Sequence, residues 1–356
     1  MSMMRRRVSR VVVGLTVLSA LLLTGIYADF KPSITPPVDE PFAGRYRYYG
    51  LAVSPENSDQ IWLVGSYGQV RISDDGGEHW RSGWTGTHQH LQDAVALGNG
   101  TVVAVGNGGD ILRSEDSGQT WQAVPGVPSS DIENKLVRIR QAPDGALWAV
   151  GVMGAALVSR DEGRSFTQVL AREDMAWNDV GFSENGIWLV GEFGRLSYSP
   201  DGYTWRSVTA PVSESLMAVD FRGPYGVIAG LNGVVLTTED SGEHWTRIPV
   251  DSATPALYAA AMDESGEAIL GGALGQLFTL DHRTHPFLRT LDGRLAPADV
   301  VLDVDLRGRD LVALTASHPL KLSLPMRARA SSDTPAGERQ LRFDRQQMAA
   351  RSPVIR

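Results

Sequence analysis

The chain has 356 residues, of which 38 are glycine and none is cysteine, and its formal net charge is −8 at pH 7. Without cysteine, neither a disulfide nor a cysteine-linked lipid is expected, so packing alone must stabilise the fold, and about 300 residues can supply it. Residues 1–10 and residues 326–356 each carry a net charge of +4, which leaves −16 for the rest. A body this acidic repels phosphate backbones, so no nucleic-acid partner is expected.

Residues 1–29 have the pattern of an export signal. Four arginines precede an uncharged stretch of 18 residues, from Val11 to Ala28, and roughly 17–25 apolar residues suffice to span a bilayer. Because positive charge stays inside, the rest of the chain is expected outside the cytoplasm, in the periplasm. Two alternatives stay open: a signal peptide cleaved before Asp29, or an uncleaved anchor in the inner membrane. Residues 30–44 include four prolines and are predicted to form a stiff spacer.

An eight-residue phrase recurs along the rest of the chain. Its copies are SDDGGEHW at Ser73–Trp80, SEDSGQTW at Ser114–Trp121, SRDEGRSF at Ser159–Phe166 and TEDSGEHW at Thr238–Trp245, with a shortened SPDGYTW at Ser199–Trp205 and a degenerate TLDHRTHPF ending at Phe287. The closing aromatic residues are 39 to 45 residues apart. A fixed period of this size, with short strands in each unit, predicts a β-propeller.

The phrase favours a tight β-hairpin with a structural role. Its Ser or Thr and its Asp can turn their oxygens onto the local backbone, and its Gly supplies a positive φ. The aromatic residue can then lie between neighbouring sheets. The residues expected in this role are Ser73, Asp75, Gly77, Trp80, Ser114, Asp116, Gly118, Trp121, Ser159, Asp161, Gly163, Phe166, Ser199, Asp201, Gly202, Trp205, Thr238, Asp240, Gly242 and Trp245.

Each unit also has an apolar run closed by glycine, such as IWLVG from Ile61, followed by a Gly-x-x-Gly turn. Such runs of about five residues are typical of buried strands, and the turn between them of a hairpin. With a strand upstream and one after the aromatic residue, each unit has four strands. Six units carry the phrase and 300–324 provides a seventh, so we predict an all-β, seven-bladed propeller of four-stranded antiparallel blades over 45–325. Six or eight blades remain alternatives, and the ring is expected to close through 42–47.

These repeats resemble those of a known family. S-x-D-x-G-x-x-W phrases, called Asp-boxes or BNR repeats, with a period near forty and VG-x-x-G hairpins, are similar to the photosystem II stability/assembly factor family. The resemblance covers roughly 45–325. It implies a non-enzymatic seven-bladed propeller without cofactor, monomeric and outside the cytoplasm, which binds an integral membrane protein or membrane complex under assembly.

Two other classes of function stay open. Asp-boxes also occur in sialidases and other glycoside hydrolases, and Phe221-Arg222-Gly223-Pro224 fits the x-R-x-P pattern of sialidases, although it lies in the fifth unit. A structural subunit of an envelope transporter is the other alternative. No metal site is predicted, because His88 and His90 lack a third ligand nearby and Asp74 to Gly77 lacks the ligand spacing of a calcium loop.

The hairpins with Gly-x-x-Gly turns and the loops entering each innermost strand are expected to share one face, opposite the Asp-boxes. The residues expected to bind a partner there are Tyr67, Trp84, Met153, Trp177, Phe193, Arg195 and Leu231, because large apolar side chains ringed by polar ones mark protein-binding patches. Arg138 and Arg140 either add positive charge near the axis or pair with aspartates in the channel. Residues 326–356 are predicted to be a basic, flexible tail.

Overall fold

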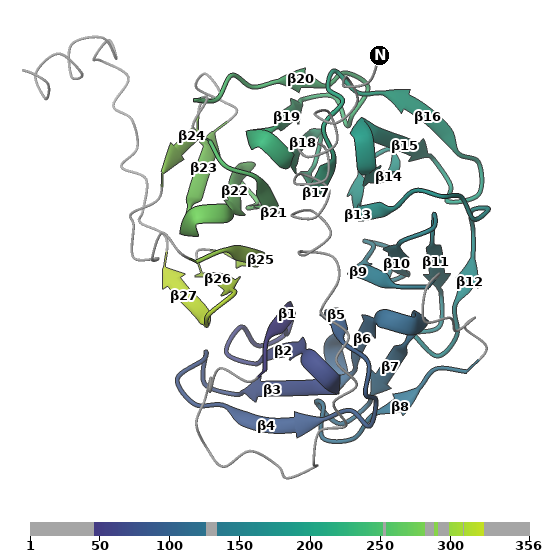
Figure 1. Cartoon of the computed structure of the whole chain (residues 1–356), viewed down its shortest axis with the longest axis vertical. Coiled ribbons are helices and arrows are strands. Elements are labelled where there is room, and N and C mark those ends of the chain that lie inside the picture. The colour runs from purple at the N-terminus through teal and green to yellow at the C-terminus, as the bar shows by residue number, and fades with distance from the viewer. Residues whose placement is uncertain are drawn as a thin grey trace, which may run out of the picture. The chain divides into compact units, whose positions relative to one another are not determined.

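The computed structural model describes residues 46–125, 134–251, 254–281, 288–290, 299–308 and 310–323. Seven antiparallel sheets stand around a central axis, each with its strands in chain order (Figure 1). The predicted seven-bladed all-β propeller is therefore confirmed. Six blades have four strands, and the seventh has three within the described residues. The predicted signal, spacer and tail, and the core of the degenerate phrase before Phe287, lie outside those residues.

The strands of each blade run outward from the axis in the order of the chain. The innermost strands are β1 (Tyr48–Val53), β5 (Leu91–Ala96), β9 (Leu136–Gln141), β13 (Trp177–Ser183), β17 (Leu216–Arg222), β21 (Leu257–Met262) and β25 (Val301–Arg307). The second strands are β2 (Ile61–Gly65), β6 (Val102–Gly106), β10 (Leu147–Gly151), β14 (Gly186–Gly191), β18 (Tyr225–Gly230), β22 (Glu267–Gly272) and β26 (Asp310–Thr315).

The third strands are β3 (Gln69–Ser73), β7 (Ile111–Ser114), β11 (Ala156–Ser159), β15 (Arg195–Ser199), β19 (Val235–Thr238), β23 (Leu277–Asp281) and β27 (Pro319–Ser323). The outermost strands are β4 (Arg81–Trp84), β8 (Gln122–Ala123), β12 (Thr167–Gln168), β16 (Arg206–Thr209), β20 (Thr246–Arg247) and β24 (Leu288–Thr290). Six 3-10 turns complete the described elements: η1 (Ser66–Gly68), η2 (Gly98–Gly100), η3 (Asn107–Gly109), η4 (Glu192–Gly194), η5 (Leu231–Gly233) and η6 (Ala273–Gly275). None of these helical turns, within the described part of the chain, is long and apolar enough to cross a bilayer.

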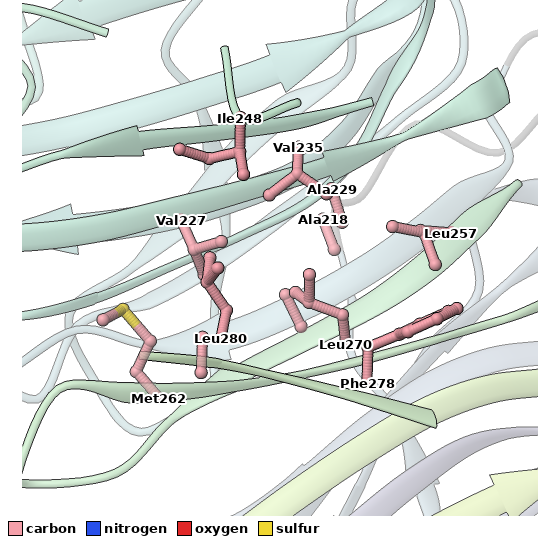
Figure 2. Packing of buried hydrophobic residues seen from close by; sticks show 12 residues of the cluster. Ala218, Val227, Ala229, Val235, Ile248, Leu257, Met262, Leu270, Phe278 and Leu280 are labelled. Atoms are coloured by element: carbon pink, nitrogen blue, oxygen red, sulfur yellow. The ribbon is translucent and has the colours of Figure 1, made fainter. Parts of the chain in front are cut away.

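The hydrophobic core is divided into layers between neighbouring blades. The apolar runs predicted from the sequence form the second strands, and β2, β6 and β10 are buried along their whole length, as expected for strands covered on both faces. Figure 2 shows the layer between the fifth and sixth blades, where Val227 and Val235 of one blade pack with Leu270 and Leu280 of the next. The large flat faces of adjacent sheets thus bury each other.

The first and last blades close the ring by direct contact. Tyr48, Leu51 and Val53 of β1 share an apolar cluster with Val312 and Leu314 of β26. Lys321 Nζ also lies 2.9 Å from Asp59 Oδ1, which joins the seventh blade to the first. The predicted closing segment 42–47 falls almost entirely outside the described residues.

Candidate partner-binding face

Backbone hydrogen bonds show that the ring has two different faces. In each of the first six blades, an N–H of the Gly-x-x-Gly turn donates to the carbonyl of the residue just before the innermost strand, for example Ser66 to Arg47 at 2.8 Å and Asn107 to His90 at 2.9 Å. We call the face formed by these turns and entering loops the hairpin face. The Asp-boxes instead contact the turns between first and second strands, as in Ser117 N to Gly100 O at 2.8 Å, and form the Asp-box face.

On the Asp-box face, the second copy of the phrase illustrates the local geometry. Ser114 Oγ accepts the N–H of Gly118 at 2.8 Å and donates to Asp116 Oδ1 at 2.8 Å. Asp116 Oδ1 also accepts the N–H of Thr120 at 2.8 Å, and Trp121 Nε1 donates to Gly118 O at 3.0 Å. The hydroxyl oxygens of Ser73, Ser159, Ser199 and Thr238 accept the equivalent glycine N–H at 2.8 to 2.9 Å. The Ser114 hydroxyl and both carboxylate oxygens of Asp116 therefore already have local partners.

The closing aromatic residues pack between blades. Trp121 lies against the cluster shared by the first two blades, Phe166 against the next, and Trp205 and Trp245 against the two after that. Buried tryptophans of the second strands reach across to the following Asp-box, since Trp62 Nε1 donates to Ser117 O at 3.0 Å and Trp188 Nε1 to Ser241 O at 3.2 Å. Each Asp-box thus fixes one blade to its predecessor.

These bonds also set the acidity of the Asp-box carboxylates. The pKa of Asp75 is lowered to about 2, first by the backbone N–H of His79. At Asp116, Asp161 and Asp240, partial desolvation opposes the shift, but hydrogen bonds from the same turn outweigh it and the pKa again falls to about 2. The lowered pKa means that the folded hairpin stabilises the charged form of each carboxylate.

The two histidines of the phrases take part in the same turns. His79 Nδ1 lies 2.6 Å from Asp75 Oδ2, and His244 Nδ1 lies 2.7 Å from Asp240 Oδ2. With Glu78 or Glu243 added, each group is close enough to hold a cation. The carboxylate oxygen nearest each imidazole is already occupied by it, so these residues act as parts of the turn.

On the hairpin face, the turns hold their third residue in the left-handed region. The residues there, with positive φ, are Tyr67 (54°), Gly108 (69°), Met153 (54°), Phe193 (54°), Asn232 (56°) and Leu274 (61°). Glycine and asparagine suit this region, whereas a bulky side chain is strained in it. Four of the six turns nevertheless carry a large apolar residue at this position.

Several of the residues predicted to bind a partner are exposed on this face. Phe193 is 71% exposed, Trp84 43% and Tyr67 37%, while Met153 and Leu231 are half-buried. Trp84 Nε1 donates to the carbonyls of Tyr67 and Thr87 at 3.1 and 3.0 Å, so its ring is fixed beside the first hairpin. The structure therefore brings Tyr67 and Trp84 together.

The prediction for Trp177 is wrong. Its side chain is only 3% exposed and belongs to the core between the third and fourth blades. Arg195 covers it, with Cζ 4.1 Å from the centroid of the indole ring, and Arg195 itself pairs with Glu173. Trp177 opens β13 rather than lying in the loop before it, and the first position of an innermost strand points into the core.

Leu274, which the sequence analysis did not select, is 53% exposed at the strained position of the sixth hairpin. Its place in the Gly-x-x-Gly turn, equivalent to that of Tyr67 and Phe193, is the signal that would have found it. Tyr203 is 70% exposed, but it lies within an Asp-box and therefore belongs to the other face.

In the channel, Arg138 and Arg140 pair with aspartates. Arg138 Nη1 lies 3.0 Å from Asp303 and 3.7 Å from Asp93, and its Nε lies 3.8 Å from Asp179. Arg140 binds both oxygens of Asp179, at 2.7 and 2.8 Å. Burial, partly offset by Arg138, raises the pKa of Asp93 to about 7. Of the two possibilities left open by the sequence, the structure shows the pairing inside the channel.

Arg222, the residue of the sialidase-like pattern, lies at the Asp-box end of this channel. It lines a cavity of about 270 Å³ together with Asp220, Arg140, Asp305 and Arg307. Arg222 Nη1 donates to Phe221 O at 2.9 Å, and Arg307 Nε lies 2.7 Å from Asp305. Among the described residues no tyrosine lines the cavity, and its arginines are already paired with aspartates. The geometry does not favour the arrangement that a sialidase needs.

The fold and the two faces define a class of protein. It is a seven-bladed propeller of BNR-type repeats, in which Asp-boxes join the blades on one face and hairpins expose apolar residues on the other. A family model described as Photosynthesis system II assembly factor YCF48 matches residues 171–278. A protein of Synechococcus sp. (strain CC9902) named Photosystem II assembly lipoprotein Ycf48 is 24% identical over 61% of this chain and 67% of its own length. Alignments with other relatives of this name span about half of their length.

Two further matches concern the fold and the alternative function. A solved structure titled "YCF48 bound to D1 peptide" is similar with a TM-score of 0.65 at 18% identity, over 80% of this chain and 95% of that one. An oligoxyloglucan-reducing end-specific xyloglucanase of Emericella nidulans is 34% identical over 26% of this chain, but over only 13% of its own length. The chain is thus a β-propeller of BNR-type repeats that is similar to photosystem II assembly factors.

Proposed function

We propose that this protein is a non-catalytic scaffold outside the cytoplasm that holds a membrane-protein client on its hairpin face while a membrane complex assembles. The observation that carries this proposal is the set of strained, exposed apolar residues in equivalent turns. Tyr67, Phe193 and Leu274 each adopt a left-handed backbone conformation, which is unfavourable for a residue with a bulky side chain. Backbone strain of this kind collects at binding sites, where it presents a side chain to a partner.

Three further points support the proposal. The relatives are named as assembly factors of a membrane complex, and one solved relative is titled as bound to a peptide of D1. The hairpins are preformed by backbone bonds to the entering loops, so little entropy is lost when a client binds. The 18-residue uncharged stretch near the N-terminus is the segment proposed to export the propeller and bring it to the membrane.

The test replaces Tyr67, Phe193 and Leu274, which we call the apolar rim, without disturbing the turns. Asn232 occupies the strained position of the fifth hairpin, so Tyr67→Asn, Phe193→Asn and Leu274→Asn, combined, keep a residue that tolerates this conformation. The triple variant should lose the membrane proteins that cross-link to the wild-type protein in cells, with an unchanged or higher Tm. Tyr203→Asn removes an equally exposed aromatic residue from the Asp-box face and should retain them. Equal capture by wild type and triple variant would show that the rim is not the site.

A further inference from the structure

Three neighbouring blades carry a basic residue at one equivalent position of the hairpin face. Arg47, His90 and Lys135 are the last residues before β1, β5 and β9, and their carbonyls accept equivalent hydrogen bonds from Ser66, Asn107 and Val152 at 2.8 to 2.9 Å. The equivalent residues of the next blades are uncharged, for example Ala176 and Ser215. The three side chains therefore start from matching points around one side of the channel mouth. We call these three residues the basic arc.

The basic arc is not neutralised within the described residues. No ion pair joins Arg47, His90 or Lys135 to a described carboxylate, although most other arginines of the propeller have one. Burial lowers the pKa of Lys135, and burial followed by the charge of Lys135 lowers the pKa of His90. Lys135 is half-buried, and a half-buried cation without a counter-ion destabilises the folded protein. In a body of net charge −16, the arc is a local reversal of sign.

Aromatic rings lie beside the arc. The His90 ring lies 4.6 Å from the Tyr67 ring and 6.0 Å from the Tyr49 ring, measured between centroids. An anionic oxygen can accept from the Arg47 guanidinium or the Lys135 ammonium group while an adjacent apolar group packs on Tyr67.

We infer that the basic arc binds carboxylates of an acidic segment of the client, with apolar side chains between the acids resting on Tyr67 and Trp84. This inference rests on the proposed function and specifies the chemistry of the bound segment. Charge complementarity favours this occupant, since the arc presents cations without described counter-ions in a body whose net negative charge otherwise repels an acidic segment. The blades then contribute differently: the first three supply the basic arc, and the fourth and sixth add apolar contacts through Phe193 and Leu274 to those of Tyr67 and Trp84.

The experiment measures binding of two peptides to the full-length protein by calorimetry. The probes are acetyl-Phe-Glu-Phe-Glu amide and acetyl-Phe-Gln-Phe-Gln amide, which differ only in charge. Wild type should bind the Glu peptide about tenfold more tightly at low salt, as expected for complementary charges at a partly desolvated site. Arg47→Gln with Lys135→Gln should abolish that preference. Both residues contribute only backbone atoms to the turn bonds, so the fold is expected to be retained.

The matched control is Arg206→Gln with Arg247→Gln, which changes the net charge equally in the exposed strands β16 and β20 and should keep the preference. Equal affinity for the two peptides, or an equal loss in the control, would overturn the inference. Phosphatidylglycerol vesicles and inorganic phosphate are tested in parallel, and arc-dependent binding to them without peptide binding would also overturn it. If the arc variant still captures the client while the Asn triple variant does not, the inference fails and the proposed function stands.

Discussion

Trp177 and Phe193 lie at the same end of the fourth blade, since Trp177 pairs with Gly191 just before the turn that holds Phe193. The structure predicts opposite consequences for their removal. Trp177→Ala deletes an indole that is 97% buried, since only 3% is exposed, and that packs with the core of two blades. Truncating a buried tryptophan to alanine costs about 3–5 kcal/mol in unfolding free energy. The guanidinium of Arg195 also loses the ring over which it stacks, which adds about 1 kcal/mol.

Phe193→Ala removes a ring that is 71% exposed and should change the unfolding free energy by no more than about 0.5 kcal/mol. By differential scanning calorimetry, Trp177→Ala should lower the Tm by roughly 6–12 °C for a domain of this size, and Phe193→Ala by no more than about 2 °C. Trp177→Phe is the informative control. It keeps an aromatic ring under Arg195 and replaces the indole by the smaller phenyl ring, which removes the N–H that is buried without a partner.

Trp177→Phe should therefore cost no more than about 1.5 kcal/mol, because the lost volume is small and no hydrogen bond is broken. Equal Tm values for Trp177→Ala and Phe193→Ala would refute the assignment of Trp177 to the core. Loss of client capture by Trp177→Ala without loss of stability would have the same meaning, since it would return Trp177 to the exposed rim.

Two further predictions concern the channel and the Asp-boxes. Arg138→Met leaves Asp303 and Asp93 as buried carboxylates without their nearest cation and should cost about 3–5 kcal/mol. Adding Asp303→Asn should recover part of this, measured by urea denaturation, and no recovery would contradict the pairing. Asp116 has a folded pKa of about 2, below its ordinary value of 3.8, so its stabilisation is present above pH ~4 and is lost as the pH falls towards 2. Asp116→Asn should flatten this part of the Tm–pH curve, whereas an unchanged slope would argue against the shift.

The fold could be read from the sequence because its information is local and repeated. Each Asp-box closes on its own backbone within eight residues, and each second strand is a continuous apolar run. Both patterns occur often enough to give the period and the number of blades. The seventh blade, which lacks the phrase, was found from its strands alone.

The site was less predictable because it depends on single positions at element boundaries. A shift of one residue decides whether Trp177 belongs to the entering loop or to β13, and this changes its side chain from exposed to buried. Arg138 and Arg140 face Asp93, Asp179 and Asp303 from other blades. Such contacts around the ring have no signature in the local sequence, so the sequence left two alternatives that only the structure resolves.

The left-handed residues of the hairpins have a free-energy cost that calls for an explanation. A left-handed conformation costs roughly 1–2 kcal/mol for a residue with a side chain, so Tyr67, Met153, Phe193 and Leu274 together cost about 4–8 kcal/mol. This is comparable with the whole net stability of a typical domain, about 5–15 kcal/mol. Gly108 and Asn232 show that the same turn forms with residues that avoid the strain. Exposed rings such as Phe193 recover little of this free energy through packing in the free protein. Under the proposed function, contacts with a bound client would offset the strain.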